Sequence, residues 1–399
     1  MAKSNEAAEL AAWRAATPGC ATRVHLNNAG ASLMPAVVKD AITGFIGREA
    51  LEGGYEAAAA AAAEIAHAYA DVAELVGAAP GQVAITTSAT HAFAQALSTF
   101  DFAPGDLILT SSDDYISNQL MYLSLAQRQG VRVVRAPDAP EGGVDLDGFR
   151  ALLERARPKV AAITWIPTNS GLVQPAEAIG ALCRQAGVPF ILDACQAVGQ
   201  LPVDVGALQC DYLATTARKF LRGPRGIGFL VVSEAALARG DAPLYVDMRG
   251  ARWTEADAFA LVDDARRFEQ WEFPYALVLG LGAAARYANQ IGILRAATRA
   301  HQLAARLRGR LMTIDGVRSL DRGTKLSAIA TFEVAGREGP DLMRALRERG
   351  INTSAQSRGD AVIDLDRKGA DSILRISPHY FNTEDEIETV AHALERLLD

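Results

Sequence analysis

The chain has 399 residues, of which 50% are hydrophobic and 22% are charged. This composition supports a large buried core, favours two domains at this length, and excludes a globally disordered protein. The net charge of −7 at pH 7 argues against a nucleic-acid partner, which would favour a clustered basic face.

The cysteine content and the N-terminal composition indicate the cellular setting. No two of the four cysteines form a C-x-x-C pair: Cys20, Cys183, Cys195 and Cys210. Their scatter is typical of neither a disulfide framework nor a zinc ribbon, so we expect a reducing cytoplasm and no metal site. Residues 1–22 carry charges and no apolar core, which predicts no secretory signal. The alanine-rich stretch 56–70 is short and charged, which indicates a soluble helix rather than a membrane span.

Short apolar runs alternate with longer helical patterns through the first two-thirds of the chain. Seven apolar runs are predicted strands: 83–86, 107–110, 131–134, 160–165, 189–193, 212–215 and 227–232. Four helices are predicted between them: 91–100, 117–129, 146–155 and 175–186. This alternation favours a mostly parallel sheet covered on both faces, with ligands at the carboxyl ends of its strands.

The pattern changes after about residue 272. One long helical stretch is predicted first and is followed by a strand, a helix, a strand and a helix: 276–312, 329–334, 341–349, 373–377 and 384–398. We expect an N-terminal arm, a large α/β domain and a smaller α+β domain: 1–24, 25–275 and 276–399. Two polar segments are predicted to be exposed loops: 138–143 and 357–368.

Lys219 follows a predicted strand in a loop of sequence TTARKFLRGPRG, residues 215–226. Most lysines in a basic turn are ordinary surface residues, but this glycine-rich loop is pinned between two apolar strands. A lysine held there beside Arg218 can have its ammonium form destabilised and can act as a nucleophile that forms a Schiff base.

Asp193 closes the apolar strand at 189–193, where an aspartate is either a helix cap or a functional acid. Pyridoxal 5′-phosphate (PLP) needs an anionic partner for its pyridine nitrogen, because the protonated ring is the better electron sink. Asp193 lies 26 residues before Lys219, about one α/β crossover away. The spacing therefore predicts that both residues face one cofactor, with Gln196 donating to the phenolate oxygen of the ring.

Two weaker signals point to anion binding. Residues 86–91, TTSATH, join a strand end to a helix start, where free N–H groups and the helix dipole favour phosphate. An ordinary Ser/Thr cap gives the same pattern. Arg375 lies inside an apolar strand, where an unpaired guanidinium is costly. It suits a bidentate α-carboxylate, and an internal salt bridge explains it equally well.

Together these residues resemble the class V aminotransferase family of fold-type I PLP enzymes, which includes cysteine desulfurases, isopenicillin N epimerase and the C–S lyases of ergothioneine synthesis. The resemblance runs from His25 to the C-terminus and depends most on the Asp-x-x-Gln and Ser/Thr-x-x-Lys motifs. It implies a mostly parallel seven-stranded sheet in a large domain, a smaller α+β C-terminal domain, and a homodimer with active sites at the interface.

The resemblance also implies roles for individual residues of this sequence. Besides Lys219, Asp193 and Gln196, it implies these contacts to the cofactor: Ala89, Thr90, Tyr115, Thr168, Asn169, Thr216 and Arg218. It implies these contacts to the substrate: Arg375, Asn28, Ala29, Tyr55 and His379. A purely structural histidine is an equal alternative for His379.

The chain departs from the desulfurases of this family in two places. Desulfurases carry a nucleophilic cysteine on the loop before the final arginine strand, whereas residues 352–366 contain Ser354 and Ser357 but no cysteine. Desulfurases also place Gly-Thr-Pro after an Arg-Phe-Glu motif, whereas the motif at 267–269 is followed here by Gln-Trp-Glu-Phe-Pro. The first departure argues against a persulfide-forming desulfurase. The second leaves the phosphate contact from a partner subunit open.

The resemblance therefore implies a cytoplasmic enzyme that acts on a small α-amino acid through a Schiff base on Lys219. We expect β-elimination by a C–S lyase, with a class V aminotransferase or an amino-acid epimerase as alternatives. A non-catalytic protein of the PLP fold is a more remote alternative, because Lys219 is present. We expect no nucleic-acid or membrane partner.

Overall fold

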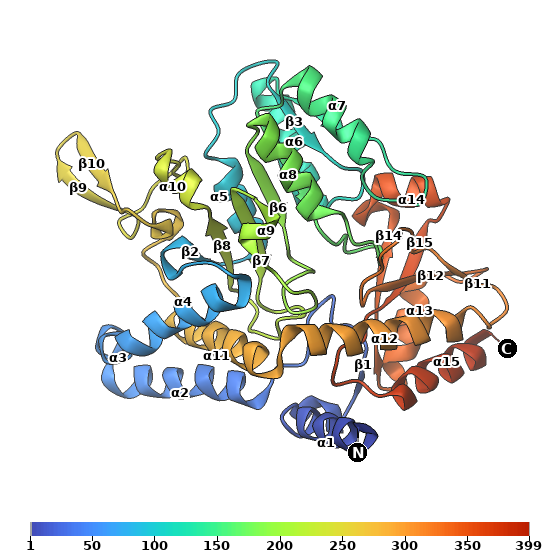
Figure 1. The fold of residues 1–399 in the computed structure, drawn as a ribbon. Helices are drawn as coiled ribbons and strands as arrows, with labels where there is room; N and C mark the ends of the chain where they lie inside the picture. The colour runs from blue at the N-terminus through green and yellow to red at the C-terminus, as the bar shows by residue number, and fades with distance from the viewer. Residues whose placement is uncertain (1, 399) are drawn as a thin grey trace.

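The computed structural model describes the backbone of residues 2–398 and the side chains of residues 6–398. A central seven-stranded sheet carries helices on both faces, and a smaller domain lies to one side of it (Figure 1). The strand order is β2-β8-β7-β6-β5-β3-β4, and only β8 runs antiparallel to its neighbours. The strands are β2 (Val83–Thr86), β3 (Leu107–Thr110), β4 (Arg132–Arg135), β5 (Val160–Thr164), β6 (Phe190–Asp193), β7 (Tyr212–Thr216) and β8 (Gly228–Val232).

The mostly parallel seven-stranded sheet is confirmed, and each strand end lies within one residue of its prediction. Every residue of the six strands other than β4 is buried, as expected for strands covered on both faces. β4 lies at the edge and begins and ends with arginine, a common way to keep an edge strand from pairing with another chain.

Helices of the large domain begin and end at recognisable signals. Ser88 caps the first helix after β2, where its side chain accepts a hydrogen bond from the amide of His91. Gly130 and Gly187 end two further helices in the left-handed conformation. These helices are α2 (Ala36–Glu52), α3 (Gly54–Ala60), α4 (Ala62–Val76), α5 (Ala89–Leu97), α6 (Ile116–Gln129), α7 (Leu146–Ala156), α8 (Ala176–Ala186), α9 (Val205–Leu208) and α10 (Glu234–Ala238).

The prediction of one long helix over 276–312 is wrong. The chain forms α11 (Tyr275–Ile291) and α12 (Ile293–Leu311), which meet at 81°. Gly292 at the junction has φ +85°, which residues with a side chain rarely adopt. No single helix among residues 2–398 has the length and apolarity to cross a bilayer, although this bent pair reaches that threshold jointly.

The smaller domain contains a four-stranded antiparallel sheet of order β11-β12-β15-β14. Its helices cover one core, and a short parallel pair attaches the N-terminal segment to it. Its elements are β11 (Val317–Ser319), β12 (Ala330–Val334), α13 (Gly339–Glu348), β13 (Ile351–Asn352), β14 (Ser354–Ser357), α14 (Val362–Lys368), β15 (Ser372–Ile376) and α15 (Glu384–Leu398), with β1 (Val24–His25) beside β13.

The prediction of an exposed loop over 357–368 is only partly right. Residues 357–360, 362, 366 and 367 are exposed as expected, but the segment contains the last residue of β14, a 3₁₀ turn and α14. Asp364 and Leu365 of α14 are buried, and Asp364 forms an ion pair with Lys368 one helical turn later.

The division at residue 275 stays a prediction. Helix α11 packs against α2 and α4, and its buried side chains belong to the core of the large domain. Helix α12 contributes Leu303, Leu307 and Leu311 to the core of the smaller domain. We therefore propose that the boundary lies at the bend at Gly292.

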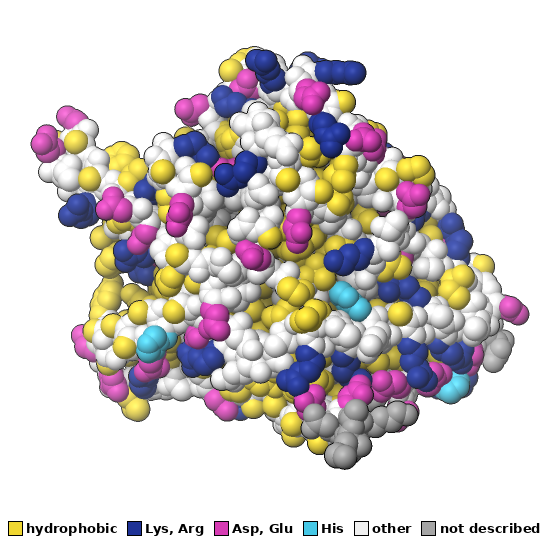
Figure 2. Space-filling view, viewed as in Figure 1, with side chains coloured by type: hydrophobic (Ala, Val, Ile, Leu, Met, Phe, Trp, Pro, Cys, Tyr) yellow, Lys and Arg dark blue, Asp and Glu magenta, His cyan; other side chains and the backbone are white. Residues whose placement is uncertain are grey.

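The N-terminal helix α1 (Ala2–Ala15) lies below both domains, and the hairpin β9 (Ala251–Glu255)–β10 (Ala258–Leu261) projects from the large domain (Figure 1). Trp253 and Phe259 on this hairpin are 81% and 58% exposed. Basic and acidic side chains are interspersed over the face in Figure 2, where neither sign forms a continuous field. Four 3₁₀ turns complete the described elements: η1 (Pro18–Ala21), η2 (Pro80–Gln82), η3 (Ala265–Phe268) and η4 (Arg358–Asp360).

Candidate active site

Neighbouring strands bring Asp193 and Lys219 together. Asp193 ends β6, and the adjacent strand β7 ends at Thr216, three residues before Lys219. Both residues are buried, with 4% and 6% of their surfaces exposed. Each lies close enough to shift the pKa of the other. The predicted pairing of carboxylate and amine is therefore present in the structure.

The environment of Lys219 favours its neutral amine. Burial lowers the pKa of Lys219, and the charges of Arg218 and Arg375 lower it further, against opposing effects of Cys195 and Asp193. An amine with a lowered pKa is deprotonated more often near neutral pH. It can therefore act as a nucleophile or as a general base.

A buried polar network orients Asp193. Its carboxylate accepts hydrogen bonds from Asn118 Nδ2 at 3.0 Å and from the amide of Cys195 at 2.9 Å. Asp114 holds Asn118 Nδ2 at 3.1 Å and Thr164 Oγ1 at 2.6 Å. Burial raises the pKa of Asp193, and the charge of Lys219 and these donors lower it. The sequence did not predict roles for Asn118 and Asp114. The one signal it offered is that the two residues lie four positions apart, about one helical turn.

The loop that carries Lys219 is anchored by Arg222, another residue that the sequence analysis missed. Arg222 is 2% exposed, and it donates to Leu33 O at 2.9 Å, to Thr17 Oγ1 at 2.6 Å and to the hydroxyl of Tyr380. Its φ of 65° is rare for a residue with a side chain. The loop is thus fixed to the N-terminal segment and to the smaller domain at once.

His379 is hydrogen-bonded to the same loop, at Phe220, so its predicted substrate role is corrected to a structural one. Its side chain is fully buried, and Nε2 lies 2.8 Å from the carbonyl oxygen of Phe220, to which it must donate. Its ring packs against those of Phe220, Tyr380 and Phe381. Burial, and then the charge of Arg222, lower the pKa of His379 to about 3, so the ring is neutral.

Arg375 reaches the site from β15. Its Nη1 donates to Thr168 O at 3.0 Å and to Thr168 Oγ1 at 2.6 Å, and its Nη2 lies 3.3 Å from Asn27 Oδ1. Nε is buried and has no partner, and no ion pair involves Arg375 among residues 6–398. Burial lowers its pKa to about 10, so the guanidinium is charged at neutral pH. The structure thus lacks the internal salt bridge that was the alternative for this residue.

Gln196 connects Thr168, beside Arg375, to the N-terminal loop. Its Nε2 donates to Thr168 Oγ1 at 3.0 Å and to Ala29 O at 3.1 Å, and its buried Oε1 has no partner. Asn169 instead donates to Asp364 Oδ2 at 2.5 Å, so it faces α14. Of the two residues predicted near the ring oxygen, only Thr168 joins Gln196.

The remaining predicted substrate residues differ in position. Asn28 is fully buried; its Nδ2 donates to Ser377 O at 2.7 Å and its Oδ1 accepts from Ser32 at 2.6 Å, so its side chain serves the loop. Ala29 presents its carbonyl to Gln196. Tyr55 is 73% exposed on α3, at the opposite end of the molecule from β15 (Figure 1). A single chain therefore does not bring Tyr55 to this site.

The predicted phosphate contacts cluster around Gly228. Thr86 at the end of β2 and Thr216 in β7 are both paired with Gly228, and α5 begins three residues after Thr86, at Ala89–Thr90. A Cβ atom on Gly228 would lie 2.3 Å from the carbonyl oxygen of Thr215 and 3.2 Å from the amide nitrogen of Ala89. Only glycine permits this approach, which leaves the first amides of α5 beside Thr216.

Tyr115 and Arg218 complete the candidate site. The ring centroid of Tyr115 lies 5.8 Å from Lys219 Nζ, and the amide of Tyr115 donates to Asp114 at 2.7 Å. Arg218 is partly buried and donates to Gly30 O. Burial lowers the pKa of Arg218, and the nearby charge of Arg225 lowers it further.

These residues fit PLP. A buried carboxylate could face the pyridine nitrogen, and a buried amine could bond to the aldehyde carbon. Arg375 Nε is a buried donor without a partner, which a ligand anion could satisfy. Gln196 Oε1 is also without a partner, but it accepts, and Gln196 Nε2 already donates to Thr168 and Ala29, so the predicted donation to the ring oxygen is not seen. The α5 amides, Thr216 and Arg218 are the donors that would hold its phosphate. Residues 6–398 contain no group of three or more His, Cys, Asp or Glu side chains placed to hold a metal.

A family model for class V aminotransferases matches residues 24–390. The chain belongs to this family. The resemblance and the PLP cofactor are confirmed, and the chain is a PLP-dependent enzyme of the class V aminotransferase family. The fold-type I architecture is confirmed with them.

Individual relatives include both lyases and desulfurases. The chain is 29% identical over 384 residues to a probable hercynylcysteine sulfoxide lyase of Mycobacterium tuberculosis, a match that covers 96% of this chain and 92% of the relative. It is 28% identical over 288 residues to a probable cysteine desulfurase of Methanothermobacter thermautotrophicus, covering 71% of each. The structure of the cysteine desulfurase CsdA from Escherichia coli is similar, with a TM-score of 0.87, 25% identity and 98% coverage of both chains.

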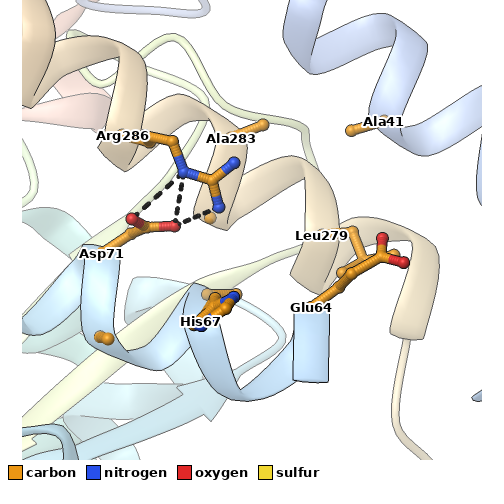
Figure 3. A pocket seen from close by; sticks show the side chains of 10 residues that line it. Ala41, Glu64, His67, Asp71, Leu279, Ala283 and Arg286 are labelled. Atoms are coloured by element: carbon orange, nitrogen blue, oxygen red, sulfur yellow. Dashed lines mark hydrogen bonds and ion pairs between the residues drawn. The ribbon is translucent and has the colours of Figure 1, made fainter. Parts of the chain in front are cut away.

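A separate surface hollow lies between α2, α4 and α11, away from these residues. Its volume is about 320 Å³, and small side chains such as Ala41 and Ala283 are among those that line it. Asp71 and Arg286 also line it and form an ion pair of 2.6 Å (Figure 3). None of the candidate site residues lines it, so it is distinct from the candidate active site.

Proposed function

We propose that the chain catalyses β-elimination from a small α-amino acid that carries a sulfur leaving group on Cβ, without forming a persulfide on a cysteine. A match to a probable hercynylcysteine sulfoxide lyase that covers 96% of this chain and 92% of the relative supports a C–S lyase, whereas two probable desulfurases that match 94% of this chain are covered only to 55% and 62% of their own length. Aminotransfer and epimerisation are the competing outcomes of the same site.

The observation that carries the proposal is the absence of a thiol from residues 352–366, the segment before the Arg375 strand. In the structure this segment is β14, η4 and α14, and it presents serine and aspartate side chains. Cys195 is the thiol next to Lys219, and burial raises its pKa, which makes it a poor nucleophile. A desulfurase mechanism therefore lacks its sulfur acceptor.

The proposed roles follow from the geometry. Arg375 would bind the substrate α-carboxylate, and Lys219 Nζ, as a neutral amine, would take up the Cα proton. Asp193 would be the acid that holds the proton of the bound ring nitrogen, and Asn118 keeps that carboxylate in position. PLP, when bound, supplies a conjugated ring that spreads the electron pair left on Cα.

The elimination balances as follows. The Cβ–S bond breaks, sulfur leaves with the bonding electron pair, and a proton returns to it. A cysteine-derived substrate then yields pyruvate and ammonia after one water is consumed.

We also propose that the cofactor phosphate is bound by Ala89, Thr90, Thr216 and Arg218, and that Tyr115 stacks on its ring.

We further propose a cytoplasmic homodimer with no nucleic-acid or membrane partner. Four unpaired cysteines support a reducing compartment. Exposed apolar side chains on α2, α3 and the β9–β10 hairpin support a second copy that covers them: Leu51, Tyr55 and Trp253. In such a dimer Tyr55 would serve the site of the partner subunit.

Product analysis of the purified holoenzyme tests the proposed reaction. With S-alkyl cysteine sulfoxides we expect pyruvate and ammonia in equal amounts and no need for a keto acid. A strict requirement for a keto-acid acceptor would instead establish an aminotransferase. Loss of optical rotation without either product would establish an epimerase.

A further inference from the structure

A second buried carboxylate, that of Asp114, lies beside the carboxylate of Asp193. Asp114 follows β3 in the loop that leads into α6. Both carboxylates accept a hydrogen bond from one atom, Asn118 Nδ2, at 3.1 Å for Asp114 Oδ1 and at 3.0 Å for Asp193 Oδ2. The two oxygens are thus within about 6 Å of each other, where like charges interact. Burial is the largest cause of the raised pKa of Asp193, and the charge of Asp114 adds to it.

The surroundings of Asp114 favour its ionised form. No basic side chain pairs with it among residues 6–398. Hydrogen-bond donors surround the carboxylate instead, and donors stabilise a charged acceptor. Besides Asn118 these donors are Tyr115 N at 2.7 Å, Thr164 Oγ1 at 2.6 Å, Gln119 Nε2 at 2.8 Å and Thr110 Oγ1 at 3.1 Å. A negative charge held only by hydrogen bonds therefore lies next to Asp193.

Asn118 connects the two carboxylates in a defined orientation. Its amide NH₂ group has two hydrogens, and a bond to each carboxylate uses both. The bond to Asp114 fixes the amide group, so the second N–H is directed at Asp193 Oδ2. The other oxygen of Asp193 accepts from the amide of Cys195 at 2.9 Å. Each oxygen of Asp193 thus has a fixed donor, and one of these donors is positioned by Asp114.

The same chain of contacts continues away from the site. Gln119 Nε2 donates to Asp114, and Gln119 Oε1 accepts from Arg135 Nη2 at 2.5 Å. Arg135 is the last residue of the edge strand β4. Asp114 is therefore held from the edge of the sheet as well as from its own loop.

We propose that Asp114 is a positioning residue for the cofactor, which directs the Asp193 carboxylate toward the ring nitrogen through Asn118 and adds a negative charge that helps to hold the proton of that nitrogen. The inference rests on the proposed place of Asp193 opposite the ring nitrogen. It assigns to Asp114 an effect on one atom of the ring and none on the phosphate or on Lys219.

Two ligands that differ only at that atom test the assignment: PLP and its analogue with CH in place of the ring nitrogen. Their dissociation constants are measured by absorbance titration of the apoenzyme. We expect the wild type to bind PLP about 10- to 100-fold more tightly than the analogue. Asp114→Asn keeps the shape of the side chain and removes its charge, and it should lower this preference by about 3- to 10-fold. Asn118→Ala breaks the same connection without altering Asp114 and should lower it too.

Asp113→Asn is the matched control, because Asp113 is the neighbouring carboxylate of the same loop but lies against Asp364 of α14. It should keep the wild-type preference. An equal loss of affinity for both ligands in Asp114→Asn, as a damaged fold would cause, leaves the preference unchanged and would overturn the inference. An unchanged preference in Asn118→Ala would overturn it as well.

Asp193→Ala separates this inference from the assignment on which it rests. It should reduce the preference for PLP to about one. A preference that survives in Asp193→Ala would overturn the place of Asp193, and the role of Asp114 with it. A preference that is lost in Asp193→Ala but unchanged in Asp114→Asn would overturn the role of Asp114 alone.

Discussion

The pKa of the buried Asp193 carboxylate is set by burial and by the groups around it. Burial raises the pKa of Asp193 above its ordinary value, and the charge of Lys219 and the hydrogen bonds from Asn118 and the Cys195 amide offset part of that rise. The sequence predicted Asp193, Lys219, Gln196 and Arg375 because each has a motif or an unusual place in an apolar strand. It did not predict Asn118, because its contact with Asp193 joins residues 75 apart and exists only in the fold.

Asp193→Ala should still bind PLP, because the phosphate contacts and Lys219 are unchanged. Proton abstraction should slow by at least about 100-fold, since no acid holds the ring nitrogen protonated. Single-turnover kinetics at saturating substrate measure this rate. Asn118→Ala, which leaves the carboxylate in place, should lose less. An unchanged rate in Asp193→Ala would remove the residue from its proposed role.

At the level of elements, apolar runs predicted the seven strands well because both faces of the sheet are buried. The same reasoning failed at α14, where a polar segment forms a helix that pairs Lys368 with a buried Asp364. It failed again at Gly292, because a glycine inside a helical pattern does not reveal whether the helix continues or bends. Tertiary contacts decide both cases, and the sequence pattern does not contain them.

His379, three residues after β15, is hydrogen-bonded to Phe220 O in the Lys219 loop. Because this buried histidine is neutral in the folded protein, we expect the free energy of unfolding to depend on pH. The folded pKa of His379 is about 3, whereas an unfolded histidine has its pKa near 6.5. The unfolded chain therefore takes up the proton first as the pH falls below 6.5. Stability that is present above pH 6.5 is lost toward pH 3, at up to about 1.4 kcal/mol per pH unit.

Urea unfolding of wild type and His379→Gln at pH 7, 6 and 5 measures this effect. Glutamine can keep the hydrogen bond to Phe220 O but does not titrate, so the free energy of unfolding should fall less with pH in the variant. The difference should reach about 2 kcal/mol by pH 5. His67→Gln, which alters an exposed histidine, is the control. Identical slopes for His379→Gln and wild type would contradict the structural role of His379.

At the scale of the whole molecule, three parts of the chain build one site. The large domain supplies Lys219 and Asp193, and the smaller domain supplies Arg375. The N-terminal loop contacts both domains, because Asn27 accepts a hydrogen bond from Arg375 and Ala29 accepts one from Gln196. Arg222 joins all three parts. The sequence indicated these residues separately, but it could not show that Tyr55 lies far from them or that a cavity opens beside Asn169.

We propose above all that Lys219 carries PLP opposite Asp193. Reduction of the holoenzyme with borohydride, followed by mass analysis of its peptides, tests this assignment. We expect a reduced pyridoxyl phosphate on the peptide containing Lys219, and loss of the label, of the visible cofactor band and of turnover in Lys219→Ala. A label on a different lysine, or full turnover by Lys219→Ala, would show that Lys219 does not carry the cofactor.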